Sequence, residues 1–362
     1  IPRIDFSDDA NGALLLEPTA TNLVVQSQVF SGYSGSNRIV TDNSIVSPDG
    51  TVTGAILADN GLGGTSSVQL FESVTVDVSS TYTYSVFAKK KDLNFIALRT
   101  GSFTTPSDGQ SYFDLNLGTT LGVATGHTSK IENYGNGWYR CSITFNTDAV
   151  DTAGTIITRL SEDGTTATVD LDNTSNAYIW GFQFEKNYAT SYIKTIGSPQ
   201  TRVADTANLS NLTSRGLLNN SAMVLYFEND IQSNTIDSYK EVIALYSDAY
   251  NAGFRLETRV NNQVYVQQDS LISSGDNFNS FTLGANSVNF KKIAVYLTTT
   301  QFKVFADGSQ VGSTFNGVYT LNFNNIGFRQ GDLAVESVIK TKDVRVYNTA
   351  LSDAELTSLT TI

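Results

Sequence analysis

The chain has 362 residues, with 35 Asp and Glu against 23 Lys and Arg, and its formal net charge is −12. This length allows two domains of ordinary size, each with its own core. The acidic balance excludes nucleic acid as a partner and disfavours an anionic lipid surface. The sequence contains no apolar run of about 20 residues, so we expect no membrane insertion. It begins at Ile1 without Met, and we expect it to be part of a longer protein.

The single cysteine and the single histidine limit the chemistry of the chain. Cys141 cannot form an intrachain disulfide, and its strand position is that of a small buried hydrophobe. His127 is the only candidate for a histidine-dependent mechanism, and a multi-histidine metal site is excluded. The 17 Tyr, 20 Phe and many short alternating segments indicate all-β domains.

The first half of the chain predicts a series of strands. An apolar run at 14–16 is stopped by Glu17 and Pro18, which fits a strand buried on both faces. The run of Lys at 89–91 favours a solvated strand end over an anion site. Alternating apolar residues predict further strands around 74–78, 82–88, 95–99, 112–117, 138–145 and 155–160.

The segment 178–205 marks the end of the first domain. Tyr178, Trp180, Phe182 and Phe184 alternate with other residues, which predicts a strand with one aromatic, buried face. The Ser, Thr, Gly and Pro that follow, around residues 197–199, predict a surface crossing. We therefore expect one domain at 1–205 and a second at 206–362, which makes two tandem antiparallel β-sandwiches of the jelly-roll type with a short C-terminal helix.

Three segments of the first half resemble, in the same order, the signature of a domain recurrent in bacteriophage structural proteins. They are PRID with LLLEP and TNL near the start, GNGWYR before an alternating strand, and WGFQFEKNYATSYIKT followed by TRVAD. The likeness covers about residues 1–205 and departs from the family at Lys194, where Pro is usual. It implies a carbohydrate-binding-module-like jelly roll on a virion protein.

The second half predicts strands at 223–227 and 242–246. In the hairpin that follows, a three-residue loop at 261–263 keeps Val264 and Val266 on the face of Val260, because register follows the buried face. Val304 and Val311 should pair across a two-residue turn at 307–308. Val344 and Val346 should point inward.

The end of the chain reads KDVRVYNTALSDAELTSL, in which Ser352 and Glu355 form a capping box that opens a short helix. Residues 215–362 resemble laminin-G-like, concanavalin-A-like domains, whose last strand often reads Asp-Val-Arg-Val-Tyr. This resemblance implies the fold and says little about activity.

An enzyme of this fold would need a recognisable set of side chains. The Glu-x-Asp-x-x-Glu strand of retaining glycosidases is missing from the sequence. Arg255, Glu257 and Arg259 resemble the first motif of alginate lyases, but the second motif, Gln-x-His, is missing. We interpret the three as surface ion pairs on an exposed strand face and predict no catalytic residues.

We predict no cofactor. A structural Ca²⁺ remains an alternative, because the sequence has Asp-rich loops and carboxylate oxygens are the usual ligands of this ion. The alternative is that these residues form turns, and the sequence assigns no ligand set. The loops contain Asp5, Asp8, Asp9, Glu162, Asp163, Asp170, Asp172 and Asp269.

A glycan site is predicted on the outer face of the second sandwich, because aromatic faces and hydrogen-bonding side chains together bind sugars. Tyr265 and Gln267 should lie beside Arg255, Glu257 and Arg259 on that face. The alternative is a set of ordinary solvated positions. The site would also include Tyr246, Tyr250 and Asn251, which should lie in or near an adjacent loop.

Together, the residues and the resemblances lead us to expect a non-enzymatic virion surface protein, a spike, fibre or tail component, that adheres to host-surface or environmental glycans. Other virion proteins would be its neighbours, and by analogy with fibres it would be a homo-oligomer, a trimer. Position on head or tail stays open. One alternative is a polysaccharide lyase or depolymerase that acts through the Arg-Glu-Arg strand. Another is a purely architectural capsid or tail decoration protein.

Overall fold

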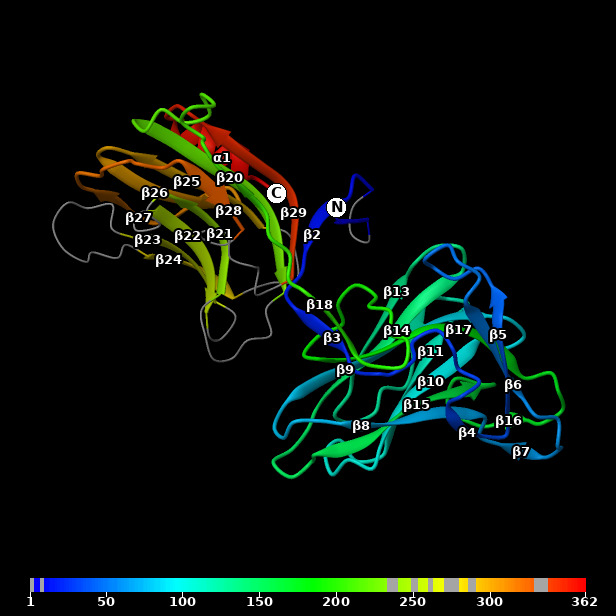
Figure 1. Ribbon diagram of the computed structural model, residues 1–362. Coiled ribbons are helices and arrows are strands. Elements are labelled where there is room, and N and C mark those ends of the chain that lie inside the picture. Colours follow the sequence, from blue (N-terminus) through cyan, green and yellow to red (C-terminus); the bar gives the residue numbers. More distant parts are fainter. Residues whose placement is uncertain are drawn as a thin grey trace. The chain divides into compact units, whose positions relative to one another are not determined.

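The computed structural model describes residues 3–6, 10–232, 240–248, 253–259, 263–269, 280–285, 291–328 and 338–362. In these residues the regular structure is β-strand, apart from the C-terminal helix α1 (Asp353–Thr360) (Figure 1). None of them forms a helix long and apolar enough to cross a membrane. The chain divides into two compact units, Ala20–Arg202 and a second unit that combines Ile1–Thr19 with Val203–Ile362.

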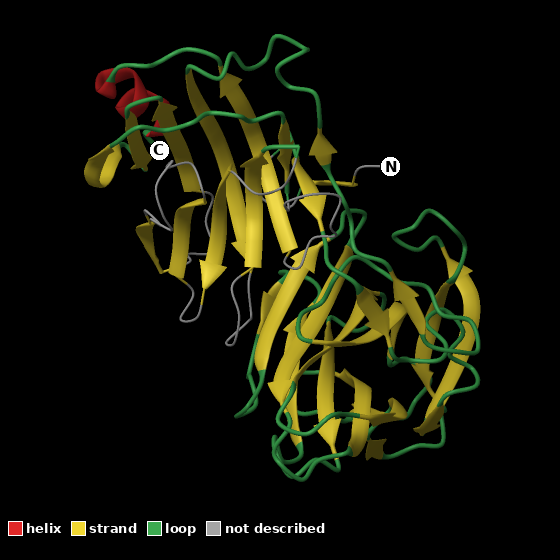
Figure 2. Cartoon of the chain, turned by 60° about the vertical axis from the view of Figure 1, so that its left-hand side comes forward, coloured by secondary structure: helices red, strands yellow, loops and turns green. Residues whose placement is uncertain are grey.

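The unit Ala20–Arg202 is a sandwich of two six-stranded antiparallel sheets (Figure 2). Its core lies between the sheets and contains Tyr84, Phe113, Phe145 and Phe184. One sheet has the order β12 (Thr119–Thr120), β11 (Gly109–Asp114), β10 (Phe95–Gly101), β15 (Ala153–Ser161), β8 (Gln69–Thr75) and β4 (Ser34–Ser36). The other has the order β13 (Thr128–Asn133), β14 (Trp138–Asn146), β9 (Thr81–Lys90), β17 (Asn176–Lys186), β6 (Gly54–Asp59) and β5 (Arg38–Ile45).

The second unit is also a two-sheet antiparallel sandwich, so the predicted all-β class is confirmed. The helix α1 packs on the outer face of the first sheet through Leu356. That sheet has the order β1 (Arg3–Asp5), β2 (Ala13–Leu16), β29 (Val338–Tyr347), β20 (Ala222–Gln232), β25 (Lys291–Thr298), β26 (Gln301–Ala306) and β27 (Ser309–Asn316). The other has the order β19 (Asn208–Leu209), β28 (Asn325–Gly327), β21 (Lys240–Tyr246), β22 (Gly253–Arg259), β23 (Gln263–Asp269) and β24 (Ser280–Ala285).

The placement of the first 19 residues corrects the predicted domain 1–205. Strand β2 pairs with β29, so the run at 14–16 belongs to a sheet of the C-terminal sandwich. Leu16 is buried there, in the same core as Phe227 and Ile339. Arg3 forms ion pairs with Glu17 and Asp205. The second ion pair links the N-terminal segment to the residues just after Val203, where the chain re-enters this unit. The apolar run predicted a buried strand correctly, but it contained no information about which sheet would receive it.

A bulge in β17 corrects the predicted single aromatic face. Register shifts between Trp180 and Gln183, and Gly181 at the bulge has φ +63°. The extra residue reverses the alternation. Ile179 and Phe182 therefore face the core, whereas Trp180 lies on the opposite face with Phe87.

Most predicted turns and pairings of the C-terminal half are confirmed. Val304 pairs with Val311 across a turn at Asp307 and Gly308, which have φ +47° and +80°. The capping box of Ser352 with Glu355 is present. Of the two valines expected inside, Val346 packs against the core but Val344 is 38% exposed.

In the hairpin β22–β23, Arg259 pairs with Gln263, so three residues connect the strands as predicted. The connection is residues 260–262, one position earlier than expected. The faces are unaffected, because Leu256 pairs with Val266 and Glu257 with Tyr265.

Candidate functional site

The signature segments of the first half meet in a polar cluster on the outer side of β17, made by Arg140, Glu185, Thr190 and Ser85. Arg140 and Glu185 are buried, with Nη2 and Oε2 3.9 Å apart. The guanidinium donates to the carbonyl of Thr190 (2.6 Å) and to Ser85 Oγ (3.0 and 3.2 Å). Glu185 accepts hydrogen bonds from the amide and the hydroxyl of Thr190. The Gly-Trp-Tyr-Arg and closing motifs therefore serve the scaffold.

Asn22, from the Thr-Asn-Leu motif, forms hydrogen bonds to β17 and to the segment that follows it. Its Nδ2 donates to the carbonyls of Phe182 (3.1 Å) and Ile193 (2.8 Å), and its Oδ1 accepts from the amide of Phe184 (3.1 Å). Oδ1 also accepts from the amide of Val24 (3.3 Å), so the side chain of Asn22 makes four hydrogen bonds inside the protein and leaves no place for a ligand.

The residues predicted as a glycan site are only partly on the described surface. Arg255 and Glu257 form the expected ion pair at 3.3 Å, but the Glu257 side chain is 1% exposed, which corrects its assignment to an open outer face. Tyr246 ends β21, in agreement with the predicted strand at 242–246, but its side chain is buried and does not belong to an open face.

Four more predicted site residues have no described side chain. Arg259, Tyr265 and Gln267 lie in strands whose register sets Arg255 opposite Gln267, but their side chains are outside the described structure. Tyr250 lies wholly outside the described residues, as does its neighbour Asn251.

His127 and Cys141 are buried structural residues. Nε2 and Nδ1 of His127 lie 2.9 Å from Thr100 Oγ1 and Ser111 Oγ. Burial lowers the pKa of His127 to about 4, which favours the neutral ring. Ser111 is fully buried, so the pair does not form an accessible nucleophile. Cys141 lies in the sandwich core, as predicted, and burial raises the pKa of its thiol.

Among the described residues, no three His, Cys, Asp or Glu side chains come together in a way that could hold a metal ion. The acidic loop residues instead bond to their own turns. Asp163 accepts from the amides of Thr165 and Thr166, and these bonds lower the pKa of its carboxyl. Asp172 makes the same kind of contact with Thr174. Asp5 pairs with Lys340, and Asp8, Asp9 and the Asp269 side chain are outside the described structure.

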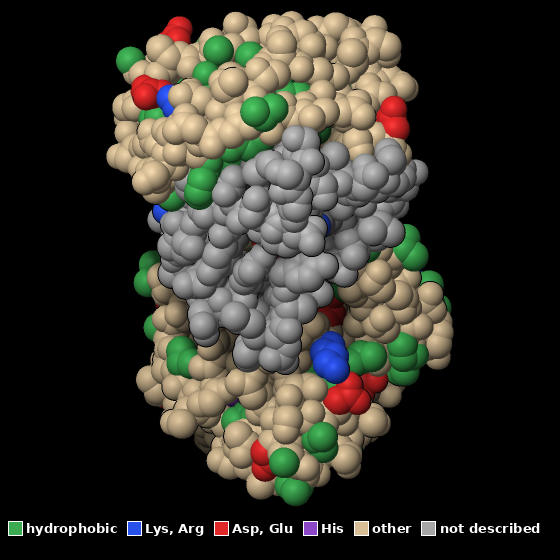
Figure 3. All heavy atoms as spheres, turned by 90° about the vertical axis from the view of Figure 1, so that its left-hand side faces the viewer, with side chains coloured by type: hydrophobic (Ala, Val, Ile, Leu, Met, Phe, Trp, Pro, Cys, Tyr) green, Lys and Arg blue, Asp and Glu red, His purple; other side chains and the backbone are tan. Residues whose placement is uncertain are grey.

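On the described part of the face seen in Figure 3, acidic side chains occur at scattered positions, and Lys and Arg do not gather into a patch. Each lysine of the 89–91 run has a local partner, and β9 ends at Lys90, as predicted for a strand end.

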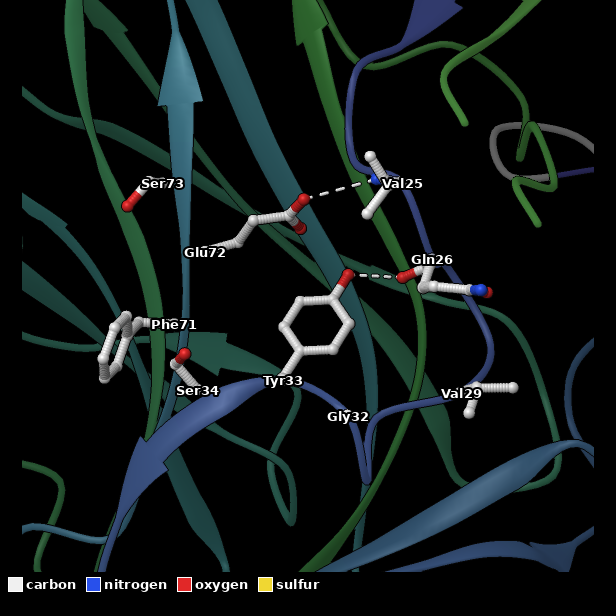
Figure 4. Close-up of a pocket in the computed structure, with 9 residues that line it drawn as sticks. All are labelled: Val25, Gln26, Val29, Gly32, Tyr33, Ser34, Phe71, Glu72 and Ser73. Carbon is white, nitrogen blue, oxygen red and sulfur yellow. Dashed lines mark hydrogen bonds between the residues drawn. The ribbon is translucent and has the colours of Figure 1, made fainter. Parts of the chain in front are cut away.

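A pocket of about 340 Å³ opens at one edge of the Ala20–Arg202 sandwich, beside β8. We call it the Glu72 pocket. The short strand β4 pairs only with residues 69–71 of β8. Beyond Phe71, the edge of β8 therefore faces the segment 25–33, and the pocket lies where the two diverge (Figure 4).

The walls of the Glu72 pocket are largely apolar. Val25 and Val29 are 42% and 44% exposed and form one side. The ring of Tyr33 extends into the pocket, and its hydroxyl donates to the carbonyl of Gln26 (Figure 4). Burial and the nearby charge of Glu72 raise the pKa of Tyr33, so this hydroxyl keeps its proton.

Glu72 extends from β8 toward the same space as Tyr33, while the side chain of Phe71 points to the other side of the strand (Figure 4). Its Oε1 accepts from the amide of Val25 at 3.3 Å. Its Oε2 is buried and has no hydrogen-bond partner among the described residues. Burial raises the pKa of the Glu72 carboxyl, and hydrogen bonding with the Val25 amide and the Tyr33 hydroxyl offsets part of this effect.

Sequence reasoning missed this pocket, although a signal was present. Leu70, Glu72 and Val74 have the same parity in β8, and the two apolar residues face the core. A carboxylate on the apolar face of a strand needs an explanation, because an unpaired charge is costly to bury. Its neighbours in the pocket come from a segment more than 30 residues earlier, which no local pattern reveals.

A second pocket, of about 410 Å³, lies in the unit that contains Val203–Ile362. It opens between the two sheets and is lined mainly by apolar side chains, among them Leu209, Leu217, Ile326, Phe328 and Val346. None of the described residues that line it is charged, so it offers few hydrogen bonds to a sugar.

The sequence matches no protein-family model and no curated protein sequence. Among solved structures, the CBM40 module of the Ruminococcus gnavus IT-sialidase, bound to α2,3-sialyllactose, is 15% identical with a TM-score of 0.33, over 41% of this chain and 86% of that one. A leech intramolecular trans-sialidase is 14% identical with a TM-score of 0.33, over 43% of this chain and 27% of that one. The binding domain of botulinum neurotoxin DC, solved with rat synaptotagmin II, is 11% identical with a TM-score of 0.34, over 43% of this chain and 39% of that one. At these TM-scores the comparisons assign neither a family nor a ligand.

Proposed function

We propose that the protein is a non-enzymatic surface component of a bacteriophage particle, a spike, fibre or tail protein, that binds host-surface or environmental glycans. The observation that carries glycan binding is the Glu72 pocket, where a buried carboxylate oxygen without a partner lies among apolar side chains. The phage assignment is supported by the three ordered sequence motifs.

The pocket has the properties that a sugar requires. A small-molecule site is commonly a concave space of about 300–1,000 Å³ with apolar walls and a few fixed polar groups. Val25, Val29 and the Tyr33 ring supply surfaces for sugar C–H groups, and Glu72 supplies an acceptor for hydroxyl hydrogens. Because Glu72 is held by the Val25 amide, this acceptor is already in place before binding.

Binding is favoured over hydrolysis because the Glu72 pocket has one carboxylate. Glycosidases place two carboxyl groups on opposite sides of the bond, roughly 5–9.5 Å apart. No second Asp or Glu is among the described residues that line this pocket. A lyase that uses Arg255, Glu257 and Arg259 would also need its carboxylate to reach substrate, but Glu257 is 1% exposed.

An architectural decoration protein is the second candidate, and the apolar pocket near Leu209 and Phe328 favours it. Such a surface suits an apolar segment of a neighbouring virion subunit better than a sugar. A trimeric or other homo-oligomeric fibre is compatible with either function.

The test is a glycan array with the full chain and with two matched variants. Val29 lines the pocket and is 44% exposed, whereas Val78 is 43% exposed and lies outside it. We expect wild type and Val78→Glu to bind the same glycans, and Val29→Glu to lose them, because its side chain fills the pocket and repels Glu72. Background signal for every glycan with wild type contradicts glycan binding. Unsaturated products formed from alginate or capsule would instead support the lyase.

A further inference from the structure

We infer that the Glu72 pocket selects sugars that are uncharged or carry an amine, and that it rejects sugars bearing a carboxylate or a sulfate. This inference rests on the proposed glycan binding, since it names the class of glycan that the same site takes. It is argued from the hydrogen-bonding groups and the charges that line the pocket.

The first argument concerns hydrogen bonds. Glu72 Oε1 accepts from the Val25 amide, but Oε2 is buried without a hydrogen-bond partner among the described residues. A Tyr hydroxyl has a single hydrogen, and that of Tyr33 is donated to the Gln26 carbonyl. The Glu72 carboxylate is a hydrogen-bond acceptor, so a ligand group that contacts it must bring a hydrogen. A sugar hydroxyl or an ammonium group does so, whereas a carboxylate or sulfate offers only acceptors.

The second argument concerns charge. None of the described residues that line the pocket is Lys, Arg or His, so no cation there compensates a second negative charge. Arg38, a neighbouring cation in sequence, donates to the backbone carbonyl of Tyr33 and is not among the lining residues. An anionic sugar would therefore meet the Glu72 carboxylate directly, in partly buried surroundings where like charges repel more strongly than in water.

The behaviour of Glu72 itself agrees with this picture. Burial is the largest effect on the pKa of its carboxyl and raises it, and hydrogen bonding with the Val25 amide and the Tyr33 hydroxyl acts in the opposite direction. No positively charged side chain among the described residues contributes to the pKa of Glu72. The formal charge of −12 on the whole chain adds a weaker repulsion of the same sign.

The experiment compares three forms of one oligosaccharide for binding to the full chain. The probes are a neutral glycan chosen as the strongest array signal, its amine-bearing analogue, and its sialylated analogue. We expect the sialylated form to bind at least about tenfold more weakly than the neutral one. In Glu72→Gln, the preference for the amine over the neutral form should disappear and the penalty on the sialylated form should shrink.

The outcomes separate this inference from the proposed function. Equal or tighter binding of the sialylated form to wild type, lost in Val29→Glu, overturns the selectivity and leaves glycan binding in place. An unchanged ranking of the three forms in Glu72→Gln likewise overturns it, because the ranking would not depend on the carboxylate. Absence of binding to any glycan on the array contradicts the proposed function and the inference together.

Discussion

Two carboxylates in the same sandwich, the buried Glu185 and the half-buried Glu72, differ in their partners. Glu185 and Glu72 both have a pKa raised by burial. Glu185 lies beside Arg140 and accepts hydrogen bonds from Thr190, so its negative charge is compensated by groups of the protein itself. Glu72 accepts from the Val25 amide, has no ion-pair partner among the described residues, and lines a pocket. A buried carboxylate is therefore not by itself a sign of a binding site. A carboxylate that lines a pocket without a cation beside it is a better sign.

The largest effect should come from breaking the Arg140–Glu185 pair. Arg140→Met leaves the Glu185 charge buried without its partner, which should lower the free energy of unfolding by about 3–5 kcal/mol. Both tryptophans of the chain, Trp138 and Trp180, are buried in this unit, so denaturation followed by tryptophan fluorescence reports on it.

The matched control for that pair is Lys130→Met. Lys130 pairs with Glu132 at 2.7 Å, but its side chain is 58% exposed, and the change should cost less than about 1 kcal/mol. Similar losses in the two variants would contradict the view that the Arg140 cluster holds the sandwich together.

A smaller effect should follow from Gly181→Ala, in the bulge that precedes Glu185. A Cβ there would lie 2.8 Å from Cδ2 of Phe87, at a backbone φ of +63°. Left-handed strain costs about 1–2 kcal/mol, and the close contact adds to it. Gly197→Ala has φ +80° with open space around the Cβ, so it should show the strain alone. Equal unfolding free energies for the two variants would refute a tightly packed bulge.

His127 is a third buried titratable group, and it is fully partnered like Glu185. The unfolded chain takes up a proton near the ordinary pKa of 6.5, but the folded protein only near 4. Between these values the unfolded state binds more protons, so stability should fall as pH drops from about 6.5 to 4. The loss should reach roughly 2–3 kcal/mol. His127→Gln should lack this fall, and identical pH profiles of stability for the two proteins would contradict a neutral, buried ring.

The smallest effect, and the one of opposite sign, should come from Glu72→Gln. The raised pKa of Glu72 means that its charged form destabilises the fold, a penalty absent below the ordinary carboxyl pKa and present at neutral pH. The neutral amide removes that penalty, so the variant should be slightly more stable than wild type at pH 7 and equal to it at low pH. Glu185 also has a raised pKa, but Glu185→Gln should lose stability, because the amide leaves the buried Arg140 charge without its counter-ion. A loss in both would erase the distinction between the two carboxylates.

Sequence patterns predicted the elements whose cause is local. The turn at Asp307 and Gly308, the Ser352 cap and the buried Cys141 each follow from a few adjacent residues. The bulge at Gly181 was missed because an alternating pattern cannot show where one residue is added, and that residue sent Trp180 and Phe182 to opposite faces.

Long-range pairing set the limit for the rest. The run at 14–16 predicts a strand, but its pairing with residues 339–341 spans most of the chain. The same limit applies to the site. Glu257 looked like a surface residue because polar positions alternate in β22, yet it is buried, while Glu72 meets Val25 and Tyr33 only after the sandwich has folded.

The most direct test of the account is a structure of the full chain with its strongest array glycan bound. The account predicts the sugar in the Glu72 pocket, against Val25, Val29 and Tyr33, with a hydroxyl or amine donating to the Glu72 carboxylate. A sugar bound instead at the strands of Arg255 and Tyr265, with the Glu72 pocket empty, would contradict it.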